Sequence, residues 1–479
     1  MDFNSIPFVC FFIVFFFLYW LVFNRSLKLQ NLFILLGSYV FYGWWDWRFL
    51  VLLVSYSLLN YLLGYYIYKA TAQKTKIILK NIGVLVGLGT LFYFKYTNFF
   101  IASFLTAFAK FNIHLNIHTL ALALPLGISF YTFRTLSYLF DIKNGKIKPA
   151  TNWVTFFSFV AFFPTLLSGP IDKAKTLIPQ FEKKRKFQYD VAVDAIRQIL
   201  WGIFKKIVIA DKLADITNPI FDNYHSYPGS TLALATVYYA VQLYADFSGY
   251  SDMAIGLARL MGFEVTRNFN YPFFSQNIAE FWRKWHISLT SWLTEYVFTP
   301  LSITFRDYDK WGLVISILIN FTLIGIWHGA NWTFVLFGFL HGCYYIPLII
   351  KGTINKKKNL DPNKFLPSFT EAVNILKTFA LVSFSFILFR SNSVTSAIGY
   401  IRRIFSPSII SSPELLPISL LALITLFFTI EWLGKDHDFA IAKLGIKWPR
   451  LLRWGFYYVL IIIIFQFAGP KQQFIYFQF

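Results

Sequence analysis

The sequence predicts an all-α protein that crosses a membrane many times. Of its 479 residues, 57% are hydrophobic and 21% are aromatic, whereas only 14% are charged. The mean hydropathy is +0.54. One helical crossing of a bilayer takes about 20 mainly apolar residues, and the chain contains many runs that approach this length. We therefore expect roughly 11 to 13 helices that cross or re-enter the membrane, in a single domain over residues 1–479.

The apolar runs follow one another along the chain with short polar segments between them. Several runs are shorter than a full span, so some are expected to enter the bilayer without crossing it. No polar segment is long enough to form a separate soluble domain. The clearest runs are Ile6–Phe23, Leu29–Phe41, Leu50–Tyr68, Ile77–Phe94, Phe99–Phe111, Leu120–Phe140, Trp153–Leu167, Leu232–Tyr244, Leu313–Trp327, Thr333–Ile350, Ile375–Phe389, Leu415–Ile430 and Leu451–Phe467.

The positive charge lies in the loops between these runs. The formal net charge is +21, and the densest basic segments are Lys69–Lys80, Lys173–Lys186 and Lys351–Lys364. Loops rich in lysine and arginine remain on the cytoplasmic side of a membrane. Anionic lipid headgroups of the bilayer are therefore the expected partners of this charge. No motif supports binding to nucleic acid.

The segment Ala279–Pro300, "AEFWRKWHISLTSWLTEYVFTP", has the pattern of one amphipathic helix. Tryptophan, leucine and tyrosine recur in it at spacings of three and four, which places them on one apolar face. Arg283, His286 and Thr290 fall on a neighbouring face. A helix of this kind lies in the membrane interface or dips partway into the bilayer. His286 is then expected near the boundary, where a polar substrate arrives.

Two aspartates interrupt the otherwise apolar segment Tyr244–Phe263. Asp246 and Asp252 stand there among small and hydroxyl-bearing residues. Ionisable groups at membrane depth are costly and usually face a bundle interior or a water-filled cavity. One interpretation is that the two carboxylates line such a cavity. The other is that they bond to helix ends or to Arg259 and hold helices together.

The run Trp311–Ile350 contains no Asp, Glu, Lys or Arg. As one helix its 40 residues would extend about 60 Å, roughly twice the hydrocarbon thickness, so the run must break. The best place is "HGAN", residues 328–331, because Gly and Asn readily end helices. His328 is then either a cavity-lining residue at a break in the membrane or a helix-end residue at the surface. His341 is an isolated imidazole on an apolar helix, and a structural role suits it better.

A neutral imidazole in an apolar, enclosed site suits a general base that activates a hydroxyl for attack on an acyl group. Covalent catalysis has less support, because the nearby thiol of Cys343 lies in an apolar context that disfavours the thiolate. The sequence has no Gly-x-Ser-x-Gly, phosphate-binding Walker loop or His-Glu-x-x-His motif. With two cysteines, Cys10 and Cys343, it has no Cys-x-x-Cys zinc pattern either. No metal is predicted.

These segments together resemble the membrane-bound O-acyltransferase (MBOAT) family, and within it the bacterial AlgI-like branch, which is related to DltB. The resemblance covers the central half of the chain, and the opening "YVFYGWWDWRF" and closing "FIYFQF" are also similar. The matching motifs are "LPLGISFYTFRTLSYLFD" (Leu124–Asp141), "LLSGPI" (Leu166–Ile171), "YADFSGYSDMAIG" (Tyr244–Gly256), "FWRKWHISLTSWL" (Phe281–Leu293) and "IWHGANWTFVLFGFLHG" (Ile326–Gly342).

The resemblance implies a ring of helices around a central funnel in which a cytoplasmic acyl donor meets an acceptor from the other side. It implies that His328 is the catalytic histidine and that His286 is the second polar residue of the site. Residues expected to line the funnel are Asp246, Asp252, Asn331, Trp327 and Arg283. The chain departs from the family pattern after His286, where Thr294 and Glu295 replace arginine and aspartate. The shape of that loop is therefore open.

The C-terminal tail, residues 471–479, follows Gly469 and Pro470 and is too short to cross the membrane. From its residues alone it is an aromatic anchor at the membrane interface. The resemblance suggests another role, in which Tyr476 relays the acyl group from the donor to a secreted acyltransferase.

The expected function is transfer of an acyl group, most simply acetyl, from a cytoplasmic thioester toward hydroxyls of an exported surface polysaccharide. The donor would be acetyl-CoA or an acyl carrier protein, bound as a substrate, with no permanently bound cofactor. An SGNH-type acyltransferase outside the membrane would be the partner, and the bacterial inner membrane the location. The alternatives are a transporter or flippase without acyl chemistry, and an MBOAT that acylates lipid, teichoic acid, peptidoglycan or protein.

Overall fold

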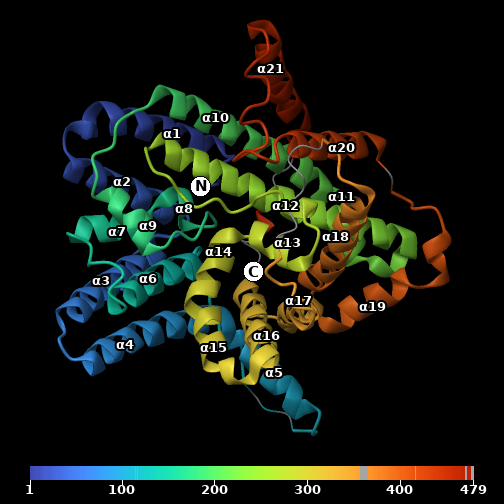
Figure 1. The fold of residues 1–479 in the computed structure, drawn as a ribbon, viewed down its shortest axis with the longest axis horizontal. Coiled ribbons are helices and arrows are strands. Elements are labelled where there is room, and N and C mark those ends of the chain that lie inside the picture. Colours follow the sequence, from blue (N-terminus) through green and yellow to red (C-terminus); the bar gives the residue numbers. More distant parts are fainter. Residues whose placement is uncertain (114, 116, 357–364, 416, 470–471, 476–479) are drawn as a thin grey trace. The chain divides into compact units, whose positions relative to one another are not determined.

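The computed structural model describes residues 1–113, 115, 117–356, 365–415, 417–469 and 472–475. Within these residues the regular structure is helical and contains no strand, which confirms the predicted fold class (Figure 1). The chain packs as two compact units, the first made of residues 1–195 and 254–266 and the second of residues 196–253 and 267–479. A single membrane domain and a central funnel stay predictions.

The first unit is built from the N-terminal helices. Two π-helical turns, η1 and η3, continue the helices that precede them, and α10 and α12 contribute residues to both units. The elements are α1 (Ile6–Phe17), η1 (Leu18–Val22), η2 (Phe23–Arg25), α2 (Leu27–Gly43), α3 (Trp47–Lys69), α4 (Gln73–Leu91), η3 (Phe92–Tyr96), α5 (Thr97–Ala109), α6 (Ile128–Lys143), α7 (Trp153–Ala161), α8 (Phe163–Leu166), α9 (Ala174–Phe181), α10 (Tyr189–Phe204) and α12 (Gly229–Leu260).

The second unit holds most of the residues singled out for chemistry. Its other elements are η4 (Lys205–Ala210), α11 (Asp211–Asp222), η5 (Tyr224–Ser226), η6 (Pro272–Phe274), α13 (Ile278–Lys284), α14 (Ile287–Leu293), η7 (Thr294–Phe298), α15 (Thr299–Thr304), η8 (Arg306–Tyr308), α16 (Asp309–His328), α17 (Trp332–Ile350), α18 (Phe369–Arg390), α19 (Val394–Ile404), η9 (Pro407–Ile410), α20 (Ile418–Leu433) and α21 (Arg450–Phe467).

Seven helices among the described residues are long and apolar enough to cross a membrane, which makes the chain a multi-pass membrane protein. Other predicted runs are helical but shorter, so this number lies below the 11 to 13 crossing or re-entrant helices expected. The seven are Ile6–Arg25, Trp47–Lys69, Gln73–Ala109, Arg306–His328, Trp332–Ile350, Phe369–Arg390 and Arg450–Phe467, and Ile418–Leu433 is a shorter apolar helix.

Four predicted runs differ from the structure. Ile77–Phe94 and Phe99–Phe111 are parts of one continuous helix, Gln73–Ala109, because no proline separates them and a π-helical turn carries the helix onward. The run Leu120–Phe140 becomes helical only at Ile128. The run Trp153–Leu167 divides at Phe162, because Pro164 has no N–H to donate and its ring would clash with the carbonyl four residues earlier if α7 continued; Pro164 stands instead in the first turn of α8.

Two motifs of the family resemblance meet in the core of the first unit. Arg134 of α6 is fully buried and donates hydrogen bonds to the main-chain oxygens of Val160 (3.3 Å) and Thr165 (2.7 Å). Gly127, just before α6, has a φ of +73°, and a Cβ there would lie 2.6 Å from the carbonyl oxygen of Leu166. These residues hold α6 against the segment around α8, so the motifs build the scaffold of this unit.

In the second unit, α16 and α17 form an antiparallel pair joined at the predicted break (Figure 1). α16 ends at His328, and Asn331 caps α17 by accepting a hydrogen bond from the main-chain nitrogen of Thr333 at 3.0 Å. A Cβ on Gly325 would lie 2.1 Å from the carbonyl oxygen of Phe334. The two helices therefore pack with their backbones in contact, as small residues permit in membrane helices.

The segment Ala279–Pro300 is not the single amphipathic helix predicted. α13 ends at Lys284, Trp285 is extended, and His286 has a φ of 44° and a ψ of 51°, in the left-handed region. α14 begins at the next residue. Left-handed backbone is uncommon in residues other than glycine, although histidine tolerates it better than most. The segment has the apolar periodicity of a helix. Main-chain hydrogen bonds to the extended segment around Asn268 nevertheless interrupt the helix at His286.

Candidate active site

The break before His286 is stabilised by the extended segment around Asn268. The main-chain nitrogen of Ile287 donates to the carbonyl oxygen of Asn268 at 2.9 Å, and that of Asn270 donates to the carbonyl oxygen of Lys284 at 2.9 Å. These two bonds satisfy main-chain groups that a continuous helix would have paired internally. The unusual backbone of His286 is therefore imposed by residues that precede it by about 18 positions.

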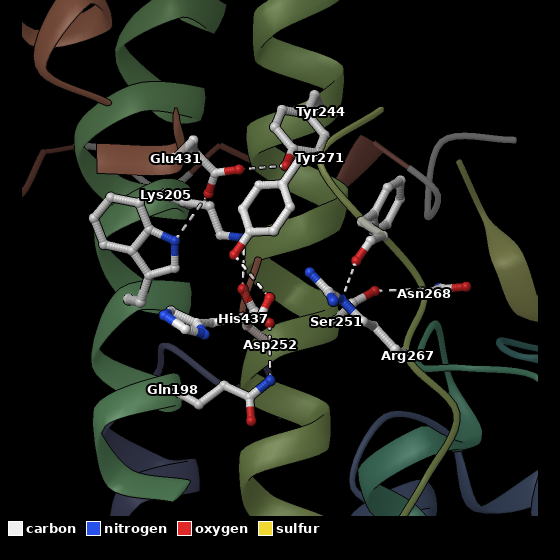
Figure 2. A network of polar contacts seen from close by, with 12 residues as sticks. Gln198, Lys205, Tyr244, Ser251, Asp252, Arg267, Asn268, Tyr271, Glu431 and His437 are labelled. Carbon is white, nitrogen blue, oxygen red and sulfur yellow. Dashed lines mark hydrogen bonds and ion pairs between the residues drawn. The ribbon is translucent and has the colours of Figure 1, made fainter. Parts of the chain in front are cut away.

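The side chain of Asn268 also sets the orientation of the His286 ring. Its Oδ1 atom lies 3.1 Å from Nδ1 of His286 and accepts a hydrogen bond from the Ser288 hydroxyl at 2.8 Å. Its Nδ2 atom donates to the hydroxyl of Ser251 on α12 at 3.2 Å (Figure 2). Because Oδ1 is an acceptor, Nδ1 of His286 must carry the proton. The lone pair of the neutral ring is then on Nε2.

The structure brings His286 and His328 together. Their ring centroids are 6.5 Å apart, and the ring of Trp327 lies 5.6 Å from that of His286 and 5.1 Å from that of His328. Phe247 of α12 packs edge-on against His286 at 4.7 Å, and Phe389 of α18 lies 5.2 Å from His328. Two imidazoles 42 positions apart in sequence thus share one aromatic environment.

Both histidines are buried, with 0% of His286 and 4% of His328 exposed. His286 lies outside the seven membrane-crossing helices. Burial lowers the pKa of its imidazole to about 3, because the charged form would be removed from water. The ring is therefore neutral at physiological pH. A neutral ring with a fixed lone pair can accept a proton or a hydrogen bond from a hydroxyl.

His341 does not belong to this pair. Its Nδ1 atom accepts a hydrogen bond from the indole Nε1 of Trp282 at 3.1 Å, and its Nε2 atom lies 2.7 Å from the hydroxyl of Ser385. That hydroxyl donates to the carbonyl oxygen of Val382 at 2.7 Å, so it accepts from Nε2. Both ring nitrogens are engaged between α13, α17 and α18. This geometry agrees with the structural role that the sequence favoured.

Asp252 lies in the network of polar contacts drawn in Figure 2, which also includes Ser251 and Asn268. Its carboxylate pairs with Lys205 at 2.5 Å and accepts a hydrogen bond from Gln198 at 3.0 Å. On the other side of the network, the buried Glu431 of α20 accepts from Trp201 at 3.1 Å and from the hydroxyl of Tyr244 at 2.6 Å. These bonds join α10, η4, α12 and α20 and favour the interpretation in which Asp252 holds helices together.

Asp246 pairs with Lys206 at 2.8 Å, and the same ammonium group lies 2.8 Å from Asp211. Burial raises the pKa of Asp211 to about 6, and Lys206 opposes the rise. Asp246 also lines a small cavity with Tyr239 and Arg390. Each aspartate thus has a lysine of η4 as its partner. The predicted alternative partner, Arg259, pairs instead with Asp194 at 2.8 Å.

The remaining predicted residues lie in different places. Trp327 contacts both histidines, as described above. Asn331 caps α17 and donates to the carbonyl oxygen of Asn392 at 2.8 Å. Arg283 is exposed and donates to the carbonyl oxygen of Ile354 at 3.3 Å. Tyr476 lies outside the described residues, so its position stays a prediction.

Sequence reasoning missed Asn268, which contacts His286, and several charged residues that partner Asp246 and Asp252 or lie near them. Asn268 stands in "NFNYPFF" without any pattern that marks it. Lys205 and Lys206 gave a usable signal, because two adjacent lysines interrupt an apolar stretch and such charges need partners. Glu431 gave a similar signal, because it is a charged residue directly after the apolar run Leu415–Ile430. No group of three or more His, Cys, Asp or Glu side chains in the described ranges could hold a metal ion.

Comparison with known proteins adds a family match. The model of a family described as MBOAT, membrane-bound O-acyltransferase family, matches residues 8–350. This range includes both histidines of the pair and Asn268. It also includes the motifs that build the first unit.

Individual relatives are similar over most of the chain. The probable alginate O-acetylase AlgI of Pseudomonas putida is 34% identical over 94% of this chain and 95% of its own length. The AlgI protein of Pseudomonas aeruginosa is 37% identical over 85% of this chain and 75% of its own length. A peptidoglycan O-acetyltransferase of Helicobacter pylori is 31% identical over 78% of this chain and 73% of its own length.

Proposed function

This chain belongs to the membrane-bound O-acyltransferase (MBOAT) family and is an O-acyltransferase, and from this premise we propose its substrates and the roles of its residues. It transfers an acetyl group from a thioester at the cytoplasmic side toward hydroxyl groups of an exported polysaccharide. The observation that carries this proposal is the pair of buried imidazoles, His286 and His328, within one aromatic environment.

His328 acts as the general base. It takes the proton of the attacking hydroxyl while the hydroxyl oxygen forms a bond to the thioester carbonyl carbon. The carbon–sulfur bond then breaks, and the proton passes from the imidazole to the leaving thiolate. His286, held by Asn268 with its lone pair on Nε2, orients the hydroxyl. The apolar rings around the pair exclude water, which would otherwise compete as the acceptor.

Tyr476 supplies the first attacking hydroxyl in this proposal. Its phenol oxygen takes the acetyl group from the thioester, with the proton following the route through His328 to the thiolate. A second transfer passes the acetyl group from the tyrosyl ester to an acceptor hydroxyl on the other side, and the phenol recovers a proton. An SGNH-type acyltransferase outside the membrane is the partner that carries out this second transfer.

The acceptor class follows from the relatives. The AlgI proteins, named as probable alginate O-acetylases, align over up to 94% of this chain. The teichoic acid D-alanyltransferase of Streptococcus thermophilus is 32% identical but aligns over only 55% of the chain. The longer alignment favours acetyl transfer to a polysaccharide. A transporter without acyl chemistry, the competing hypothesis, is not favoured by family membership. We assign the enzyme to the bacterial inner membrane, which the bacterial sources of the relatives support.

The test uses the full-length enzyme in lipid nanodiscs with radiolabelled acetyl-CoA or an acetylated carrier protein. The wild type should release free thiol and carry label as an ester on Tyr476. His328→Ala should abolish both signals, and Tyr476→Phe should abolish the label. His225→Ala and Tyr458→Phe are matched controls, because both residues are exposed and lie on other elements. Normal thiol release by His328→Ala would refute its role as the base.

A further inference from the structure

A charged cluster lies buried at the junction of η4, α11 and α12. The side chain of Lys206 is 7% exposed, that of Asp246 is 2% exposed and that of Asp211 is 13% exposed. Lys206 bridges the two carboxylates at 2.8 Å each. The cluster therefore carries one more negative than positive charge. Such a cluster has capacity for further hydrogen-bond donors, and an unsatisfied buried carboxylate oxygen is costly.

The missing partners come from the C-terminal tail. The main-chain nitrogen of Ile475 donates to Oδ2 of Asp246 at 2.9 Å, while Oδ1 of the same carboxylate faces Lys206. Lys206 also donates to the carbonyl oxygen of Gln472 at 3.2 Å. The Gln472 side chain donates to Asp215 at 2.9 Å. The two charged residues thus hold the tail by its main chain at two points, three residues apart.

The tail segment between these points is packed against α12. The ring of Phe474 stacks on that of Tyr250, with centroids 4.6 Å apart and an interplanar angle of 27°. It also lies 6.1 Å from the ring of Phe247, which in turn packs edge-on against His286. Phe474 and Ile475 are both buried. The anchored tail is therefore separated from the histidine pair by one aromatic ring.

The energetics favour a tail that stays in place. Removing it would take the Ile475 N–H from a carboxylate that is 2% exposed, and the Gln472 oxygen from a buried ammonium group. Hydrogen bonds to charged groups are among the stronger ones in proteins, and a charged partner left buried without its bond is costly. The tail offers a main-chain donor to the carboxylate and a main-chain acceptor to the ammonium group.

We propose that Lys206 and Asp246 form a receptor for the C-terminal tail and act as positioning residues for the acyl relay. They bind Gln472 and Ile475 through main-chain atoms only, and Ile475 directly precedes Tyr476 in the sequence. The role in the relay rests on the proposed function, whereas the binding of the tail does not. A change of the Ile475 side chain that preserves its main-chain N–H should therefore leave the bond to Asp246 intact.

The test compares two substitutions at one position of the full-length enzyme. Ile475→Pro removes the N–H donor to Asp246, whereas Ile475→Val keeps it and is the matched control. Trypsin cuts after Lys471, and mass spectrometry follows the release of the peptide 472–479. We expect release to be at least about tenfold faster from Ile475→Pro than from the wild type or Ile475→Val. Asp246→Ala should behave like Ile475→Pro.

The same samples are then assayed for acetyl label on Tyr476. Ile475→Pro and Asp246→Ala should lose at least about 90% of the wild-type labelling rate, with the KM for the thioester unchanged, because positioning and not donor binding is lost. Equal tryptic release from all four proteins would overturn the anchor. Faster release with unchanged labelling would overturn the positioning role. If the wild type itself takes no label, the proposed relay fails, and tryptic release still decides whether the anchor exists.

Discussion

Nδ1 of His286 lies 3.1 Å from Oδ1 of Asn268, whose side-chain nitrogen is bonded in turn to Ser251 of α12. This chain of contacts connects the histidine pair to α12. A histidine in left-handed backbone is thus fixed both by its main chain and by its ring. Fixing the ring in this way leaves the lone pair on Nε2, the nitrogen that the proposed mechanism uses to orient the hydroxyl.

The first prediction concerns Asn268. In Asn268→Ala, the His286 ring loses its fixed tautomer and orientation, so kcat for acetyl transfer should fall about tenfold or more while the KM for the thioester stays the same. Asn268→Asp keeps the acceptor oxygen and should retain more activity than the alanine variant. Steady-state kinetics in nanodiscs measure both constants. A raised KM with an unchanged kcat would show instead that Asn268 acts in binding the donor.

The second prediction concerns pH. Burial lowers the pKa of His286 to about 3 in the folded protein, whereas an unfolded histidine has a pKa of about 6.5. Below pH 6.5 the unfolded state binds a proton that the folded state does not, so stability falls as the pH falls toward 3. At pH 5 the free energy of unfolding should be lower than at pH 7 by about 2 kcal/mol from this residue. The His286→Gln variant should lack this part of the loss.

Thermal unfolding in detergent at pH 7 and pH 5 checks this expectation. The melting temperature of the wild type should fall further between the two values than that of His286→Gln. Parallel falls for the two proteins would contradict a buried, neutral His286.

The third prediction concerns His341. Substitution by alanine leaves the Trp282 N–H and the Ser385 hydroxyl without their partner and opens a cavity between three helices. The expected loss of stability is about 2–4 kcal/mol, measured by unfolding in detergent. Activity per folded molecule should change little, because both nitrogens of His341 are engaged away from the histidine pair. A complete loss of turnover in well-folded His341→Ala protein would assign it a direct role.

The fourth prediction concerns the contact between α16 and α17. A Cβ on Gly338 would lie 2.2 Å from the carbonyl oxygen of Phe321, so Gly338→Ala must push the helices apart. We expect a loss of about 1–3 kcal/mol in stability together with reduced activity, because His328 stands at the end of α16. Gly455→Ala on α21 is the control, since nothing lies within 4 Å of the added atom. Equal stability of the two variants would exclude close backbone packing.

The features that could be read from the sequence depend on local composition. The break at residues 328–331 was predictable, because 40 uncharged residues exceed the thickness of a bilayer and glycine and asparagine mark the turn. The break at His286 was not, because the apolar spacing of Ala279–Pro300 is helical and the bonds that interrupt it come from Asn268. A periodic pattern reports which face is apolar, but it carries no information about a competing partner elsewhere in the chain.

The sequence by itself determined a helical, multi-pass membrane protein and marked His286 and His328 as candidate residues of its active site. The tertiary structure decided how the charges are used: Asp252 belongs to a network with Lys205, and Asp246 holds the C-terminal tail with Lys206. The physical reason is that burial of an ionisable group demands a partner without specifying which one. Only packing brings together groups that lie more than 200 residues apart, such as Asp246 and Ile475.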